Sequence, residues 1–560
     1  MLKFREFPYH RPDIGELRAA YAKLTRRLET AASAADQSAV MRDWMRLRSR
    51  VETAAALAGT HYNQDTTSEA RSAEKRFFDQ NGATMRELYI DLCRKVLDSP
   101  HRGELAAEWG AHLFDLFETE VASFEPVISE LVVEESELKT RYIALLASPI
   151  QFRGETINLS RLGKFVVDAD RRTRREAQQV RWGFFDANAG QFDDLFNQLT
   201  HVRDQQSTRL GYDRYTPLAY KRMARTQWGE DEAARFRAQV AEHVVPLATE
   251  LRERQRLRLG LDKMLFYDQS VMDPQGNPAP GGDDDWVIAQ AQQMYRQMGA
   301  LGPFFDMMLE RELLDLKTRD SKSGGGYCTK FSDHAAPFVF ANFNSTEADV
   351  RVLSHEIGHA FQGYSSFRYP ALDYHFPTAE ACEIHSMSLE YLTLPYMERF
   401  FGDDADRFRR NHIDEALRFL PYACAVDEFQ HRIYEAPGAT PSERRGSWQE
   451  MEHKYLPHLD YDGMVHVSTG GFWQAQRHIY LSPFYYLDYA LASTAALQFW
   501  IRARADRTQT LADYVALCEL GGSQPYLTLL DRTGLASPFE EGTVMSVVTE
   551  ARTWLAQNAT

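Results

Sequence analysis

The sequence contains the pentad His355-Glu356-Ile357-Gly358-His359, which has the form HExxH. On an α-helix, residues four positions apart lie on one face, so the two imidazoles would point in the same direction. Two histidine nitrogens aimed at one point supply half of a zinc site, and the glutamate between them can act as a base. Two surface histidines on an ordinary helix would give the same pentad, so the surrounding residues have to decide.

The residues that flank the pentad predict a helix. Ser345 or Thr346 can cap its N-terminus, with Asp349 in the first turn, and Gly363 can end it. Between these ends, apolar residues recur at three-to-four spacing and form one stripe: Val350, Leu353, Ile357 and Phe361. The two histidines therefore project from the other side of this helix.

A catalytic zinc needs a third protein ligand and an open position for water. The next predicted helix contains three candidates, Glu380, Glu383 and Glu390. Glu383 and Glu390 share a polar face, where one could bind the metal and the other could hydrogen-bond a ligating histidine. The spacing does not choose between Glu380 and Glu383. Cys382 and His385 are rival ligands, although a structural thiol and a hydrogen-bonded histidine are the commoner roles of such residues.

Hydrolysis by a metal-activated water creates an oxyanion, which needs hydrogen-bond donors that HExxH does not contain. Residues farther along the chain supply them: His478, Tyr480, Tyr485, Tyr486 and Tyr489. Ser482 and Pro483 form a cap and first-turn pair, so we expect a helix from Phe484 that places Tyr485 and Tyr489 on one face. Core packing is the commoner role of a tyrosine-rich helix.

A small amount of β-structure is predicted beside the pentad. Residues 338–343, Phe-Val-Phe-Ala-Asn-Phe, have strand composition, and an exposed edge there could pair with an extended peptide. An ordinary core strand explains the same residues equally well. A second β candidate is a hairpin around Gly154, and most of the remaining chain has the apolar spacing of helices. The sequence therefore predicts a mainly helical protein with a small sheet just before the pentad.

The composition excludes several classes of protein. The chain has 560 residues, and its 64 basic and 80 acidic side chains give a formal net charge of −16. This balance argues against a nucleic-acid partner, and the basic run at residues 171–175 favours a solvated helix face over a phosphate site. We find neither a signal peptide nor an apolar run long enough to span a bilayer. Five scattered cysteines fit free thiols, so we expect a cytoplasmic protein with no membrane partner.

The motifs together resemble a known family. HEIGHAFQ at residues 355–362, followed by Glu383 in AEACEIHSMSLE, is similar to the oligoendopeptidase F and Pz-peptidase branch of the thimet-oligopeptidase superfamily of zinc metallopeptidases. The likeness extends upstream to GGGYCTKF and PFVFANFN and downstream to RHIYLSPFYYLDYA, over roughly residues 320–495. The rest of the chain matches in length and helical character only.

The resemblance implies a metal centre. Its zinc ligands would be His355, His359 and Glu383, and Glu356 would be the general base. Glu390 would be the acid that hydrogen-bonds a ligating histidine. One Zn²⁺ per chain is therefore expected.

On the substrate side, the resemblance points to His478 and Tyr489 as donors to the oxyanion, with Tyr485 and Tyr480 next. The spacing between the histidine and the tyrosines varies across the superfamily, so the tyrosine that contacts the oxyanion stays open. The predicted edge strand would bind the substrate through its backbone at three positions: Phe340, Ala341 and Asn342.

The fold that the resemblance implies is mainly α, a zincin-type metallopeptidase that encloses a channel. Residues 1–190 would form one helical wall and residues 191–560 the catalytic domain. We expect a zinc-dependent oligoendopeptidase that cuts internal bonds of short peptides, as a monomer or small homo-oligomer. The alternatives are a non-catalytic peptide-binding protein, for which Glu356 would be superfluous, and a zinc exopeptidase, which would need a charged anchor for a peptide terminus.

Overall fold

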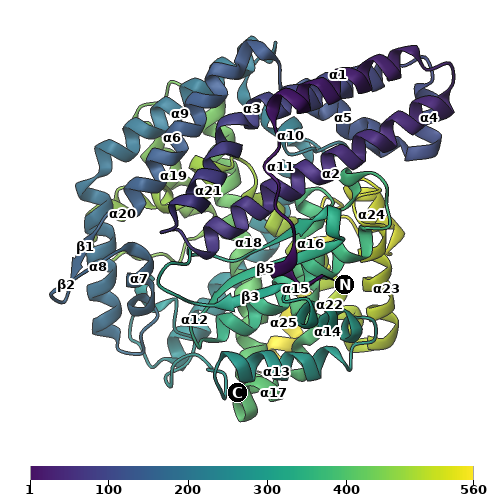
Figure 1. Ribbon diagram of the computed structural model, residues 1–560. Helices are drawn as coiled ribbons and strands as arrows, with labels where there is room; N and C mark the ends of the chain where they lie inside the picture. The colour runs from purple at the N-terminus through teal and green to yellow at the C-terminus, as the bar shows by residue number, and fades with distance from the viewer. Residues whose placement is uncertain (1, 559–560) are drawn as a thin grey trace.

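The structure is a computed structural model that describes residues 2–558, and the predicted mainly helical fold is confirmed. Helices fill most of the molecule, and strands are few and short (Figure 1). Among the described residues, no helix is both long enough and apolar enough to cross a bilayer. The helices of 15 residues or more are α1 (Ile14–Thr30), α2 (Ala34–Gln64), α3 (Glu69–Leu97), α6 (Ser129–Leu146), α8 (Arg171–Ala187), α9 (Ala189–Arg209), α15 (Glu347–Ser366), α16 (Ala379–Thr393), α18 (Ala405–Glu435), α19 (Pro441–Tyr455), α22 (Tyr486–Ala505) and α25 (Thr543–Gln557).

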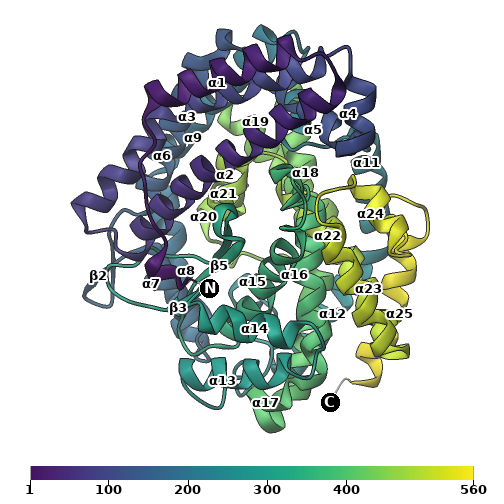
Figure 2. The ribbon, with the colours of Figure 1, turned by 45° about the vertical axis from the view of Figure 1, so that its right-hand side comes forward.

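The N-terminal helices are attached to the segment that joins α15 to α16. In Figure 2 helices α1 to α3, in purple, lie across the upper part of the molecule, above α15 and α16. Arg48 of α2 pairs with Asp373 of this segment at 2.7 Å. The hydroxyl of Tyr374 accepts the backbone N–H of Leu113 at 2.9 Å. Buried contacts of this kind tie the N-terminal region to the chain between the two helices that contain the candidate ligands.

A larger apolar cluster joins residues from both sides of position 190. Tyr142 of α6 stacks on Tyr480 of α21 (Arg477–Leu481), with ring centroids 4.0 Å apart. Arg203 of α9 donates to Glu135 and to the hydroxyl of Tyr434, both at 2.9 Å. The division at residue 190 into a wall and a catalytic domain therefore stays a prediction.

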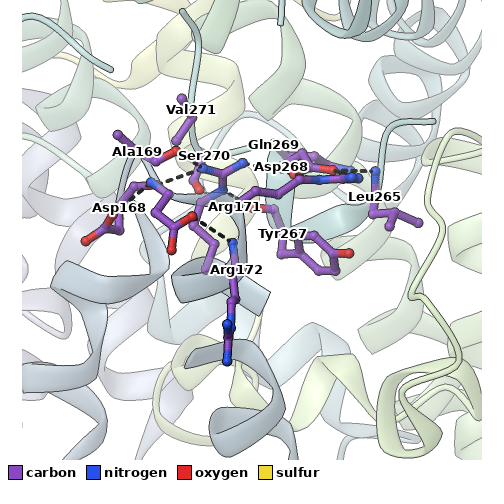
Figure 3. A network of polar contacts seen from close by, with 12 residues as sticks. Asp168, Ala169, Arg171, Arg172, Leu265, Tyr267, Asp268, Gln269, Ser270 and Val271 are labelled. Atoms are coloured by element: carbon purple, nitrogen blue, oxygen red, sulfur yellow. Dashed lines mark hydrogen bonds and ion pairs between the residues drawn. The ribbon is translucent and has the colours of Figure 1, made fainter. Parts of the chain in front are cut away.

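The basic run at residues 171–175 is in part the solvated face that the sequence suggested, because Arg171, Arg172 and Arg175 are exposed, but Arg174 is buried. Arg171 donates to the fully buried Asp268 at 2.8 and 2.9 Å, as Figure 3 shows. Arg174 is buried as well and donates to the same carboxylate at 3.0 Å. The Oδ2 atom of Asp268, which accepts from Arg171, also accepts the backbone N–H of Leu265 at 3.0 Å. These contacts fasten α8 to a turn almost a hundred residues farther along the chain.

Both predicted β-regions are present. Strands β1 (Ile150–Phe152) and β2 (Glu155–Ile157) form an antiparallel hairpin. Its two-residue turn has positive φ at both Arg153 and Gly154, as a type I′ turn requires. The second sheet has the order β3-β5-β4, with β3 at Leu314–Lys317, β4 at Tyr327–Phe331 and β5 at Ala336–Phe343.

The prediction that residues 338–343 form an edge strand is wrong. β5 is the central strand, with β3 parallel on one side and β4 antiparallel on the other. The side chain of Phe340 is fully buried and stacks on Tyr327. The β4 register ends at the pair Tyr327–Phe340, so Ala341 and the residues after it have no partner in β4.

The helix that contains the pentad begins where the sequence predicts. Thr346 is its N-cap, and Asp349 accepts the backbone N–H groups of Thr346 at 2.9 Å and Asn344 at 3.0 Å. Its end is not at Gly363, because the helix continues to Ser366. Gly363 instead makes room for Phe376, whose ring would lie 3.3 Å from an added Cβ.

Candidate metal centre and substrate cavity

The close crossing of α15 and α16 brings the predicted ligands together. A Cβ at Gly358 would lie only 2.6 Å from Cα of Ser386, so glycine permits this approach. Nε2 of His355 lies 3.3 Å and Nε2 of His359 lies 3.4 Å from the same oxygen, Oε2 of Glu383. Two imidazoles and one carboxylate thus share a small volume, which fits the donor set of a catalytic zinc site.

The other ring nitrogen of each histidine has its own partner. Nδ1 of His355 lies 2.7 Å from Oε1 of Glu390, and Nδ1 of His359 lies 3.3 Å from the sulfur of Cys382. A proton on Nδ1 leaves the Nε2 lone pair free for a metal. The structure thus places Glu390 behind one ligand and Cys382 behind the other.

Two of the rival candidates, Glu380 and His385, do not point into this cluster. Glu380 is buried on another side of α16 and accepts the indole N–H of Trp228 at 3.0 Å. Nδ1 of His385 lies 2.8 Å from the backbone oxygen of Ala381. Glu383, rather than Glu380, is therefore the carboxylate that faces the two histidines.

The charges of the cluster suit a cation. Burial lowers the pKa of His355, but its hydrogen bonds to Glu383 and Glu390 outweigh this effect and raise the pKa to about 10. Burial also acts to raise the pKa of Glu383, yet the attraction of His359 and the hydrogen bond of His355 hold it well below its usual range. A divalent cation would replace the protons that these ligands otherwise share.

Glu356 lines a cavity of about 580 Å³, together with the predicted ligand His355 and its partner Glu390. The Oε2 atom of Glu356 is buried and has no hydrogen-bond partner among the described residues. Burial raises the pKa of this carboxyl. An unpaired carboxylate oxygen with a raised pKa is suited to accept a proton.

The end of β5 and a glycine-rich loop form the opposite side of the cavity. Ala341 and Asn342 line it, together with Gly325 and Gly326. The amide of Asn342 donates to the backbone oxygens of Gly325 at 2.8 Å and Ser323 at 2.9 Å, which fastens the loop to the strand. Our sequence reasoning did not assign these glycines to the site, although the run of three glycines before the strand was a visible signal.

His478 and the tyrosines form an aromatic cluster beside Glu383. The hydroxyl of Tyr485 donates to Oε1 of Glu383 at 2.9 Å. The ring of His478 lies parallel to that of Tyr485, with centroids 5.8 Å apart, and perpendicular to that of Tyr489 at the same distance. Tyr486, which the resemblance did not single out, lies closer still to His478, at 4.9 Å.

Two predictions about this segment are wrong. The helix α22 begins at Tyr486 rather than at Phe484, which has a positive φ of 67°. Tyr480 is fully buried, packs against Tyr142 and donates to the backbone oxygen of Phe192 at 3.3 Å, so it cannot contact a substrate. His478 and Tyr480 are two positions apart, which turns their side chains to different sides of the short helix α21.

Arg351 is a further cavity residue that our sequence reasoning missed. It lies on α15 one turn before His355 and lines the same cavity. Its guanidinium pairs with Glu415 of α18 at 2.7 Å. No motif in the sequence marks it, because its partner lies 64 residues away.

Comparison with known proteins agrees with this geometry. Residues 4–124 match the Peptidase M3 N-terminal domain, and residues 302–549 match Peptidase family M3. The oligoendopeptidase F homolog of Borreliella burgdorferi is 23% identical over 258 residues, which span 44% of this chain and 42% of that protein. The chain therefore aligns with less than half the length of this curated relative.

Solved structures match the whole chain. A protein provisionally assigned as an oligoendopeptidase F is 45% identical, with a TM-score of 0.95 and full coverage of both chains. PZ peptidase A, solved with an inhibitor, is 42% identical, with a TM-score of 0.95 and coverage of 99% of each chain. A protein from Bacillus anthracis with the same provisional assignment is 39% identical, with a TM-score of 0.91 over 100% of this chain and 98% of that one. The chain belongs to peptidase family M3, in the branch of oligoendopeptidase F and PZ peptidase.

Proposed function

We propose that this peptidase is a zinc-dependent oligoendopeptidase that hydrolyses internal bonds of short peptides. One observation chiefly supports the proposal: donor atoms of His355, His359 and Glu383 lie within 4.8 Å of one another, and the unpaired oxygen of Glu356 is buried beside the same cavity. A site for binding alone would have no need of a second, unpaired carboxylate. Family membership makes a peptide the expected substrate.

Zn²⁺ held by His355, His359 and Glu383 would act as a Lewis acid that polarises the peptide carbonyl and lowers the pKa of water. Glu356 would accept the proton of the attacking water on Oε2 and then deliver it to the amine that leaves. His478 would donate a hydrogen bond to the oxyanion, with Tyr489 beside it. In this scheme Tyr485 lies beside the oxyanion donors and also holds the ligand Glu383, to which its hydroxyl already donates.

The rest of the proposal concerns the substrate and the whole molecule. The backbone of Ala341 and Asn342, which has no β4 partner, would align the peptide across the cavity. The helices of residues 1–190 would cover one side and restrict the site to short peptides. We further propose one zinc ion per chain, a monomer or small homo-oligomer, and a cytoplasmic location, which the five free cysteines support.

The substitution Glu356→Gln tests the mechanism. It keeps the shape of the side chain and removes its ability to take a proton, so we expect hydrolysis of a quenched fluorescent peptide to fall about 10³-fold or more. Zinc content, measured on the same samples, should stay at one ion per chain. Turnover near that of the wild type in zinc-loaded Glu356→Gln protein would refute the role of this residue.

Cleavage of a peptide that is blocked at both ends, compared with cleavage of the same peptide with free ends, separates the alternatives. An endopeptidase cleaves a peptide blocked at both ends, whereas an exopeptidase needs a free terminus and a charged group to anchor it. The cation that lines the cavity, Arg351, is already paired with Glu415 at 2.7 Å. We therefore expect blocked and free peptides to be cut at similar rates; binding without any cleavage would instead favour a non-catalytic peptide-binding protein.

A further inference from the structure

A short chain of hydrogen bonds holds His478 through its Nδ1 atom. Nδ1 of His478 lies 2.8 Å from Nε2 of Gln476. The hydroxyl of Tyr422, on α18, donates to Oε1 of the same Gln476 amide at 2.7 Å. The mechanism described above assigns no role to either Gln476 or Tyr422.

The backbone of Gln476 is fixed as well. Gln476 is the N-cap of α21, its N–H donates to the oxygen of Trp473 at 2.9 Å, and its own oxygen accepts the N–H of Ile479 at 3.1 Å. Two residues later, the backbone oxygen of His478 accepts the N–H of Ser482 at 2.8 Å. The amide and the imidazole are therefore held at a constant separation by the turn that contains both.

The partner of one imidazole nitrogen determines where the proton of a neutral ring lies. An amide N–H that points at Nδ1 requires a lone pair there, so the ring proton must be on Nε2. In the observed arrangement the O–H of Tyr422 donates to Oε1, which leaves the NH₂ group of the amide for His478. Burial raises the pKa of the Tyr422 phenol well above its usual value, so this donor keeps its proton.

The surroundings of His478 favour the neutral ring. Burial and then the neighbouring charge of Arg477 lower its pKa, against the opposing charge of Glu383. The other titratable groups that face the ring are phenols: Tyr485, Tyr486 and Tyr489. A neutral imidazole has a single N–H, so its position decides whether His478 can donate at all.

We propose that Gln476 is a positioning residue that keeps the proton of His478 on Nε2, and that Tyr422 orients the Gln476 amide for this purpose. The proposal rests on the proposed function, in which His478 donates to the oxyanion; Nε2 is the nitrogen available for this, because Nδ1 faces Gln476. Loss of one such donor lowers kcat about 10²- to 10³-fold in enzymes where it has been removed. The reversed tautomer would put the proton on Nδ1, which faces Gln476, and would leave Nε2 without a proton to donate.

The substitution Gln476→Glu separates this role from simple packing. The two side chains have the same shape, and a carboxylate can still accept the hydroxyl of Tyr422, but it cannot donate to Nδ1. A carboxylate beside the ring also raises the pKa of His478, so kcat is measured at a pH high enough to keep the ring neutral. There we expect kcat to fall about 50-fold or more, with KM changed less than about twofold and zinc content unchanged. Tyr422→Phe, which frees the amide to turn, should lower kcat by about 3- to 10-fold. Gln275→Glu, in an exposed loop, makes the same charge change and should have no effect.

A spectroscopic measurement tests the tautomer without any activity. In two-bond ¹H–¹⁵N spectra of protein labelled in histidine, the signal absent from His478→Phe should show a proton on Nε2 in the wild type and on Nδ1 in Gln476→Glu. A proton on Nδ1 in the wild type, or unchanged kcat in folded Gln476→Glu protein, would overturn the proposal. If the wild type cleaves no peptide, the proposed function fails, while the spectrum still decides the position of the proton. If Gln476→Glu does not fold, the wild-type spectrum and Tyr422→Phe decide.

Discussion

Glu390 contacts two histidines that come from different helices. Its Oε1 lies 2.7 Å from Nδ1 of His355 on α15, and its Oε2 lies 3.3 Å from Nε2 of His412 on α18. Burial acts to raise the pKa of Glu390, but the hydrogen bond of His355 outweighs it, so the net pKa is lowered and the group is a carboxylate. A carboxylate in this position fixes the ring of the ligand and makes its other nitrogen a better donor to a metal.

We therefore predict that Glu390→Ala weakens zinc binding about 10- to 100-fold, because His355 loses the partner that orients it. The dissociation constant can be measured by competition with a chromophoric chelator. Glu398→Ala is the matched control, since Glu398 pairs only with Arg409 near the surface. Equal zinc affinity in the wild type and Glu390→Ala would contradict the assignment.

At the residue scale the sequence was informative where a role depends on local spacing. His355, Glu356 and His359 share one helix, so their mutual placement follows from the helical period alone. The choice of Glu383 over Glu380 needed the direction from which α15 crosses α16, which no local pattern contains. Tyr480 was misassigned for a related reason, because a five-residue helix is too short for its apolar period to show which side is buried.

At the scale of elements, the site depends on how closely α15 and α16 approach each other. Gly358 lies at their crossing, where a Cβ would be 2.6 Å from Cα of Ser386 and 2.7 Å from the backbone oxygen of His385. Backbone atoms cannot move aside as the end of a flexible side chain can. We predict that Gly358→Ala lowers the free energy of unfolding by about 1–3 kcal/mol and also weakens zinc binding, because the helices must separate.

A glycine elsewhere provides the control for this prediction. Gly59 lies inside α2, and an added Cβ there has no atom within 4 Å. Gly59→Ala should therefore stabilise the protein by about 0.5–1 kcal/mol through helix propensity. Thermal or urea unfolding measures both variants. An equal gain in stability from the two substitutions would show that the crossing does not need glycine at position 358.

The order of the sheet shows where prediction of elements stops. The composition of residues 338–343 predicted a strand, and β5 is there. Its central place depends on its two neighbours. One is β3, a four-residue strand whose apolar signal is weak, and the other is β4, which pairs with β5 across the loop that joins them. Strand order is a long-range property, so composition supports an edge strand and a central strand equally. The start of α15, by contrast, was predictable because Thr346 and Asp349 cap it locally.

At the scale of the whole molecule, buried and partly buried acids are joined to distant arginines. Asp268 pairs with Arg171 and Arg174, and Asp373 pairs with Arg48. Such pairs connect segments that are far apart in the sequence, which is why the burial of Arg174 within an otherwise exposed basic run could not be predicted without its partner. Breaking a buried pair leaves a charge without compensation and costs about 3–5 kcal/mol.

Glu452 is a buried acid that has no basic partner among residues 2–558. Its hydrogen bonds come from neutral donors, the indole of Trp448 at 2.6 Å and the hydroxyl of Tyr461, and burial raises its pKa from 4.5 to about 7. A raised pKa means that the stabilising contribution is complete below about pH 4.5 and is lost as the pH rises through about 7.

Replacing Glu452 by glutamine keeps an acceptor for both donors and cannot ionise. We predict that Glu452→Gln gains about 2 kcal/mol of unfolding free energy relative to the wild type when the pH rises from 5 to 8, since each unit of pKa shift corresponds to about 1.4 kcal/mol. Urea unfolding of the two proteins at both pH values measures this difference. Glu550→Gln, which removes a negative charge from the exposed surface of α25, separates the effect of burial from that of net charge. The prediction fails if the stability difference between Glu452→Gln and the wild type is the same at pH 5 and pH 8, because an acid that stays charged at both values has no raised pKa.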